Sequence, residues 1–203
     1  MNFRFRFSIV LICLGLVAAI MSFRDTQRSG IPPREILGIL LSGENVFNAD
    51  QVAKFVIEED SGIQFVDIRP FEEFQKQSIP GALNIPFKDL LNPSNISSLD
   101  NKSLKTILYE NNDRISTQAW ILAMQSGYRN TYILKSGLAE WDSIVMLSEF
   151  KGDKITPREN AIFEVRYKAR RLFRDWNAMP DSLKAGFYAA NQKKEKELVG
   201  GCE

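Results

Sequence analysis

Few side chains in this chain of 203 residues could do covalent chemistry, because the sequence contains no histidine and only two cysteines. The lack of histidine excludes the Ser-His-Asp triad, the Cys-His dyad and every histidine metal site. Two cysteines are also too few for a zinc site or a disulfide framework, so we expect no metal and no cofactor. Cys13 lies inside an apolar run, which leaves Cys202 as the candidate catalytic thiol.

Cys202 follows Gly200 and Gly201 in a polar tail that the composition predicts to be flexible. In an oxidising compartment, a leftover cysteine suggests a reactive thiol or an intermolecular partner. Three nearby lysines favour the thiolate and three nearby glutamates oppose it. A tail cysteine without a role is the alternative interpretation, and both stay open.

A second candidate site is the polar segment 110–116, which directly follows the apolar run 104–109. Its residues are Glu110, Asn111, Asn112, Asp113, Arg114, Ile115 and Ser116. The segment leads into a helix predicted over 116–126, so its backbone amides and the helix N-terminus would together bind an anion or a partner. Its two acids are weak evidence for a metal site, and we predict none.

The elements that must position this segment alternate between strand and helix. Short apolar runs predict strands at 64–68, 83–86, 104–109 and 131–134. Periodic apolar positions predict helices at 35–41, 49–59, 71–77, 87–91, 116–126 and 138–147. This alternation predicts an α/β fold with a parallel sheet and helices on both faces. Such sheets bind ligands beyond the carboxyl ends of their strands, where segment 110–116 lies.

Several ordered motifs between residues 45 and 148 resemble the rhodanese homology domain. Residues 65–69 (FVDIR) are similar to the family's strand ending in Asp-x-Arg, and residues 78–86 (SIPGALNIP) to its second signature. Tyr109 precedes the position of the active loop. The run 134–137 (LKSG), followed by Trp141, is similar to the family's closing strand and helix. The resemblance implies a rhodanese-like fold.

The resemblance also implies a site that lacks its nucleophile. Family sulfurtransferases carry a cysteine at the start of the active loop, which holds sulfur as a persulfide that the loop amides stabilise. That position falls on Glu110, and the loop's glycine and arginine positions fall on Asp113 and Ile115. Ser78 stands at the histidine of the second signature. Because a carboxylate cannot carry sulfane sulfur, this chain resembles the noncatalytic members, which serve as binding modules.

Four further motif residues, Asp67, Arg69, Pro80 and Gly81, are interpreted as structural. We expect Asp67 to cap the turn that follows its strand and Arg69 to pair with an acid. Two tryptophans at helical positions, Trp120 and Trp141, are predicted to lie in the core.

The charges of the chain are balanced overall but segregated along it. There are 26 Lys and Arg against 25 Asp and Glu, so a generally basic nucleic-acid binder is disfavoured and we predict no nucleic-acid partner. Residues 1–44 carry five bases and three acids, residues 45–150 nine and fourteen, and residues 151–203 twelve and eight. This segregation suggests separate structural units.

The N-terminal run 7–23 is uncharged, follows Arg4 and Arg6, and precedes Arg24. This pattern predicts an export signal, which we favour as an uncleaved transmembrane anchor over a cleaved signal of a secreted protein. The basic N-terminus favours an inside position, which would leave the domain on the exported, periplasmic or extracellular side. The predicted membrane contact is therefore residues 7–23.

Thr156 and Pro157 predict the start of a basic amphipathic helix that ends near Trp176. We expect its apolar stripe to pack on the domain or a partner, with an anionic lipid surface as the alternative. The resulting organisation is a signal anchor at 1–25, a linker and short helix at 26–44, a rhodanese-like domain at 45–148, and a basic helical extension with a flexible tail at 149–203.

Three hypotheses about function follow from these residues. The first is a membrane-anchored, catalytically silent module that binds an unidentified protein partner or a small anion through segment 110–116. The second is a sulfur carrier or sulfurtransferase partner that uses Cys202. The third is a scaffold whose basic helix and tail dock onto a membrane complex.

Overall fold

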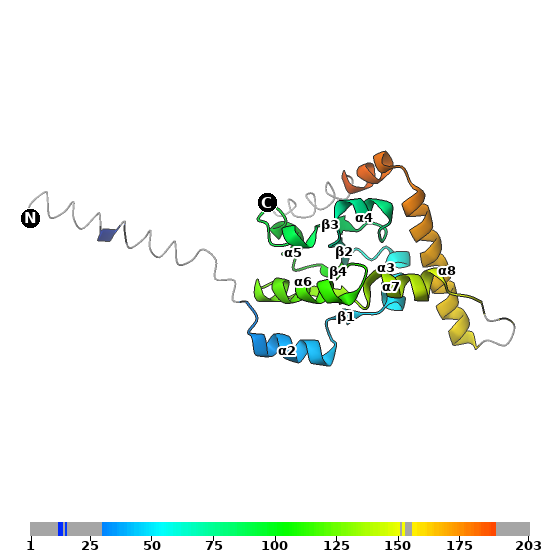
Figure 1. The fold of residues 1–203 in the computed structure, drawn as a ribbon, viewed down its shortest axis with the longest axis horizontal. Coiled ribbons are helices and arrows are strands. Elements are labelled where there is room, and N and C mark those ends of the chain that lie inside the picture. Colours follow the sequence, from blue (N-terminus) through cyan, green and yellow to red (C-terminus); the bar gives the residue numbers. More distant parts are fainter. Residues whose placement is uncertain (1–11, 14, 16–29, 151, 153–155, 190–203) are drawn as a thin grey trace, which may run out of the picture.

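The computed structural model describes residues 12–13, 15, 30–150, 152 and 156–189 (Figure 1). Most of the predicted membrane segment 7–23 lies outside these residues, as does the tail with Cys202. Within the described ranges, no helix is both long and apolar enough to cross a bilayer.

A five-stranded sheet in the order β1-β5-β4-β2-β3 forms the centre of the fold. Every pairing is parallel, with Val66 opposite Leu108 and Leu108 opposite Ile133 across the three central strands. The strands are β1 Val46–Phe47, β2 Ile63–Asp67, β3 Leu83–Asn84, β4 Lys105–Tyr109 and β5 Thr131–Leu134. The predicted parallel sheet is confirmed, and all strands present their carboxyl ends to the same edge.

Helices cover both faces of the sheet, because successive strand residues point to opposite sides. One apolar layer lies under α2 Pro33–Ser42, α5 Ile96–Leu99 and α6 Asp113–Gln125. The other lies under α3 Ala49–Glu58, α7 Gly137–Trp141, the π-helix η2 Asp142–Met146 and α8 Pro157–Ala178. Phe65 belongs to the second layer and its neighbour Val66 to the first. Trp120 and Trp141 are fully buried, as predicted.

The predicted starts of two helices are confirmed, and each start carries a capping box. Asn48 and Gln51 form a reciprocal capping box at α3, and Thr156 and Glu159 form another at α8. The short helix α4 Phe71–Lys76 and the 3-10 turn η1 Phe87–Asp89 also lie where the sequence predicts short helices.

Other elements differ from the prediction. Strand β1 has only two residues and α5 only four, and both are too short for periodicity to reveal. The predicted helix 138–147 is an α-helical turn followed by the π-helix η2. Helix α6 begins at Asp113 rather than at residue 116, because the side chain of Asn112 caps it.

Helix α8 packs along α3 and η2 and continues beyond the sheet domain (Figure 1). Ala169 and Phe173 lie on the buried face of α8, and the Phe173 ring lies 5.7 Å from that of Trp141. The guanidinium of Arg166 donates to both carboxylate oxygens of Asp50 in α3, at 2.6 and 2.7 Å. Residues 181–189 form one further helical segment after α8.

Candidate functional site at the carboxyl edge of the sheet

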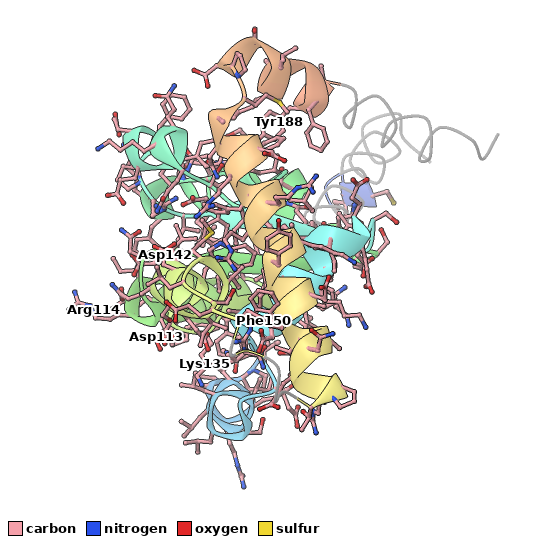
Figure 2. The ribbon with its side chains drawn as sticks, turned by 90° about the vertical axis from the view of Figure 1, so that its right-hand side faces the viewer. Asp113, Arg114, Lys135, Asp142, Phe150 and Tyr188 are labelled. Carbon is pink, nitrogen blue, oxygen red and sulfur yellow. The ribbon has the colours of Figure 1, made fainter. Side chains whose placement is uncertain are left out.

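Segment 110–116 joins β4 to α6 at the carboxyl edge, and its connecting loop is shorter than predicted. Only Glu110, Asn111 and Asn112 lie between the two elements; Asp113, Arg114, Ile115 and Ser116 form the first turn of α6. The Asn112 carboxamide oxygen accepts the Arg114 backbone N–H at 3.0 Å, which starts the helix three residues early. Figure 2 shows Asp113 and Arg114 to one side of α8, with Arg114 pointing away from the body of the protein.

The Glu110 side chain turns back into this connection instead of facing solvent. It is 7% exposed, with Oε2 accepting the Asn111 N–H at 3.2 Å and Oε1 accepting the Ile115 N–H at 3.3 Å. These amides belong to the loop and the first turn of α6, where backbone N–H groups favour a negative charge. The protein's own carboxylate therefore occupies the place where a bound anion would lie.

Helix α7 holds the same loop from the other side. The Leu138 N–H donates to the Glu110 carbonyl at 2.8 Å, and the Ala139 N–H donates to the Asn111 carbonyl at 3.1 Å. Gly137 has a φ of 57°, and a Cβ at this position would fall on the Glu110 carbonyl oxygen. The contact therefore requires glycine, both for its conformation and for the close approach.

A buried ion pair lies beside the loop. The guanidinium of Arg69 binds Asp67 through Nη2 at 2.6 Å and Nε at 3.0 Å, and the Asp67 carboxylate also accepts the Arg69 backbone N–H at 2.9 Å. Both side chains are almost fully buried. Arg69 Nη1 donates to Asn111 at 3.2 Å, and Asn111 donates to Glu73 at 2.8 Å. The pair thus connects β2 and α4 to the loop after β4.

Tyr109, the last residue of β4, is fully buried between these groups. Its hydroxyl accepts the Ile79 backbone N–H at 3.1 Å. Burial, reinforced by the neighbouring Asp67 carboxylate, raises the pKa of Tyr109 well above its usual range. The hydroxyl therefore stays neutral, and it ties the strand to the turn that contains Pro80 and Gly81.

The turn at residues 78–82 is held by contacts that the sequence does not predict. Trp176 Nε1 donates to Ser78 Oγ at 3.2 Å, and Asn177 bonds both the N–H and the carbonyl of Ser78. The Tyr188 hydroxyl donates to the Ala82 carbonyl at 2.8 Å. These contacts join residues about a hundred positions apart, so no local pattern signals them.

The rings of Trp176, Phe187 and Tyr188 pack edge-to-face above this turn. Tyr188 lies near the upper end of α8 in Figure 2. Burial and the Asp67 charge raise the pKa of Tyr188 to about 12. The C-terminal extension therefore belongs to the rim of the site.

Asp142, the first residue of η2, is a further acidic group near Arg69. Burial raises the pKa of Asp142, which the positive charge of Arg69 partly offsets. Within the described ranges, no cluster of three or more acidic, cysteine or histidine side chains could hold a metal ion. Cys202 lies outside those residues.

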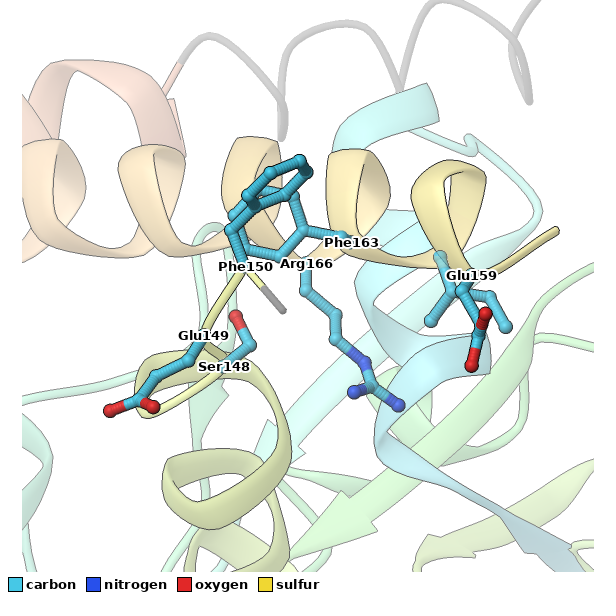
Figure 3. A pocket seen from close by; sticks show the side chains of 7 residues that line it. Ser148, Glu149, Phe150, Glu159, Phe163 and Arg166 are labelled. Atoms are coloured by element: carbon cyan, nitrogen blue, oxygen red, sulfur yellow. The ribbon is translucent and has the colours of Figure 1, made fainter. Parts of the chain in front are cut away.

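A cavity of about 200 Å³ lies elsewhere, between the segment after η2 and the first half of α8 (Figure 3). Phe150, Phe163 and Arg166 line it, and the two phenylalanine rings lie 5.3 Å apart. Of the predicted site residues that the structure describes, none lines this cavity, so the candidate site stays at the carboxyl edge of the sheet.

Comparison with known proteins agrees with the fold and the motifs. Residues 48–144 match the family model described as a Rhodanese-like domain. A curated relative, "Adenylyltransferase and sulfurtransferase UBA4" of Meyerozyma guilliermondii, is 31% identical over 88 residues, which cover 39% of this chain and 20% of that protein. The chain thus spans about a fifth of that relative's length.

Similar solved structures include a rhodanese-like domain and a single-domain sulfurtransferase. The rhodanese-like domain of the Alr3790 protein from Anabaena sp. is 22% identical, with a TM-score of 0.45 over 55% of this chain and 89% of that one. The single-domain sulfurtransferase RDL2 of Saccharomyces cerevisiae is 24% identical, with a TM-score of 0.41 over 49% of this chain and 89% of that one.

Proposed function

Because residues 48–144 form a rhodanese-like domain, we propose that this chain uses the fold as a catalytically silent binding and scaffold module. Its partner is a protein recognised at the carboxyl edge of the sheet, because Glu110 already fills the anion site of the loop. The module is held at a membrane by residues 7–23, with the domain on the exported side. The anchor rests on the uncharged run and its basic flank.

The observation that carries the proposal is the position of Glu110. Sulfur transfer in this fold would need a thiolate whose persulfide the loop amides stabilise. Here the amides of Asn111 and Ile115 are already bonded to a carboxylate, which has no sulfur to exchange. A persulfide anion at this point would also meet the charge of Glu110. The domain therefore lacks both the nucleophile and an open anion site.

What remains accessible at this edge suits recognition of a partner. Asp113 and Arg114 are exposed on the first turn of α6, and Glu73 is 42% exposed beside Asn111. Glu73 is held by Asn111 and by the buried Arg69, whereas Asp113 and Arg114 are positioned by the backbone of the first helical turn. Rigid, exposed polar groups at a strand edge are typical of binding sites built on a scaffold.

Sulfur uptake by the full chain, purified in detergent, tests catalytic silence. The protein is incubated with thiosulfate, and added sulfur is measured by mass spectrometry beside C13S, C202S and a free peptide of the tail sequence. A thiolate that takes the outer sulfur becomes a persulfide and releases sulfite. We expect no cysteine of the protein to gain sulfur faster than the peptide does.

Crosslinking in native membranes tests the binding surface itself. A photo-reactive residue at Arg114 is compared with one at Lys54, which is exposed on α3. A discrete crosslinked product from position 114 alone supports the module. Equal yields from the two positions contradict the assignment of this edge.

The second candidate function is a sulfur carrier that uses Cys202. The Gly-Gly-Cys end of the sequence favours it, as does the distant relative named as a sulfurtransferase. The sulfur-uptake experiment separates the two functions. Sulfur on Cys202 that accumulates faster in the protein than in the peptide, and is lost in C202S, supports the carrier and excludes the silent module.

A further inference from the structure

Helix α2, Pro33–Ser42, is apolar on two of its faces. One face carries Ile36, which is buried in the layer that includes α6, and the half-buried Ile39 and Leu40. The other carries Leu37 and Leu41, which are 54% and 78% exposed. A helix in a water-soluble domain normally turns polar residues outward, so the second apolar face lacks a partner within the described part of the chain.

The exposed face is a continuous stripe. Arg34, Leu37 and Leu41 follow one another at spacings of three and four residues, which place them on the same side of the helix. Gly38, between the leucines, has no heavy atom within 4 Å of a Cβ placed on it, so the stripe is open along its length. The helix also precedes residues 48–144, so it is an addition to the rhodanese-like domain. Figure 1 shows α2 at the outside of the fold, beyond α6.

The position of α2 in the sequence indicates what covers this stripe. The uncharged run 7–23 ends ten residues before Pro33. Residues 24–32, which join the run to α2, can extend over at most about 32 Å. If the run spans the bilayer, α2 is held within that distance of the membrane surface. The same segment contains Arg24 and Arg28, which anionic headgroups attract.

We propose that the exposed stripe of α2 lies on the membrane surface, with Leu37 and Leu41 at the boundary of headgroups and acyl chains. Arg34 then faces lipid phosphate. The occupant is a lipid bilayer, and the inference rests on the proposed anchor. Apolar side chains on one face of a short helix, together with a cation, are the features by which helices lie in a membrane interface. The docked helix fixes how the domain is presented above the bilayer.

The test uses the full chain in vesicles of phosphatidylcholine and phosphatidylglycerol. Both native cysteines are replaced by serine, and an environment-sensitive fluorophore is attached to L41C or, as a control, to L147C. Leu147 is 73% exposed and follows η2 on the opposite face of the sheet. Lipids with a nitroxide near the headgroup quench a fluorophore that touches the membrane. Flotation of the vesicles reports separately whether the protein is anchored.

We expect the protein to float, with strong quenching at position 41 and none at position 147. Flotation without quenching at position 41 overturns the docking of α2 and leaves the anchor standing. A blue-shifted but unquenched signal at position 41 also overturns it, because a protein surface then covers the stripe. Protein that does not float excludes both the anchor and the docking.

A second measurement avoids the fluorophore. Amide hydrogen exchange of α2 in vesicles is compared between the wild type, L37Q/L41Q and the control L147Q/L183Q, whose leucines are equally exposed. Docking predicts faster exchange in α2 for L37Q/L41Q and unchanged exchange for the control. The same exchange rate in all three proteins contradicts the proposal.

Discussion

The carboxylate of Glu110 accepts the backbone N–H of Ile115 at 3.3 Å, across the short connection from β4 to α6. With the Asn111 N–H at 3.2 Å, this makes the start of α6 an anion site filled from within the chain. A ligand can bind these amides only if the Glu110 side chain moves away from them. The relationship therefore explains how the loop between β4 and α6 is held in place.

Truncating Glu110 should open this site. E110A leaves two amide donors without their acceptor, so we expect a loss of about 1–3 kcal/mol in the free energy of unfolding. Added formate should restore part of the loss, because it returns a carboxylate to the same donors. Urea unfolding with and without formate measures this. D113A is the control, and a formate effect of equal size in wild type and E110A contradicts the prediction.

Replacing Gly137 should break the contact between α7 and the loop. G137A combines a left-handed backbone with a Cβ that meets the Glu110 carbonyl, so we expect destabilisation of more than about 1 kcal/mol. The matched control is G38A in the interior of α2, where a Cβ meets no atom within 4 Å. There alanine should be neutral or stabilising by up to about 1 kcal/mol. Thermal unfolding of both variants distinguishes them, and equal effects would refute the steric argument.

Breaking the Asp67–Arg69 pair should lower the free energy of unfolding far more than breaking the Asp50–Arg166 pair between α3 and α8. R69M leaves the buried Asp67 carboxylate without its counter-charge, which costs about 3–5 kcal/mol. R166M breaks the partly exposed pair with Asp50, where we expect about 1 kcal/mol or less. Urea unfolding of the two variants gives the comparison. Similar losses would show that burial does not govern these pairs.

Removing the Ser78 hydroxyl should weaken the hold of α8 on the turn at 78–82. In S78A the buried Trp176 Nε1 loses its acceptor, at a cost of about 1–3 kcal/mol. W176F removes the N–H donor and reduces the aromatic packing, so its loss of unfolding free energy should be larger. The exposed S143A is the control. We call the contacts of Trp176, Asn177 and Tyr188 with residues 78–82 the clamp. Hydrogen exchange at residues 78–82 should quicken in S78A and W176F, and unchanged exchange there would contradict a stabilising role of the clamp.

Alkaline pH should loosen the extension through Tyr188. Its folded pKa of about 12 lies above the usual tyrosine value of 10.0, so the stability it contributes is full below pH 10 and is lost as pH rises toward 12. Tyr109 shifts in the same direction, so it contributes to the same decline. The fall in unfolding free energy from pH 9 to pH 11 should be smaller in Y188F than in wild type. An identical fall would mean that the Tyr188 hydroxyl is not coupled to folding.

Much of this fold is visible in the sequence. The apolar runs of β2, β4 and β5 are local signals, and the strands lie where these runs predict them. The helices that Asn48 and Thr156 cap also begin where the sequence predicts. Strand β1 and helix α5 were missed because two and four residues carry no period. The start of α6 was placed three residues late, because asparagine is both a loop residue and a helix cap.

The candidate site is predictable only in part. The position of segment 110–116 follows from the alternation of strands and helices and from the motifs around it. The inward turn of Glu110 depends on the approach of Gly137, and the closure of residues 78–82 depends on Trp176, Asn177 and Tyr188. These are contacts between distant parts of the chain, which side-chain type and local spacing do not encode.

The clamp on residues 78–82 also sets the order in which the protein is completed. Its bonds join positions 98, 99 and 106 residues apart, so the turn waits for chain that is synthesised much later. At about 5–20 residues per second, that delay is on the order of 5–20 s. The sheet has all its strands once Leu134 is made, so from then until Tyr188 is made the turn at 78–82 lacks its contacts with the extension. Completion of the domain is thereby coupled to the arrival of residues 181–189. A chain cut short before Tyr188 would leave the Ala82 carbonyl without this hydrogen bond.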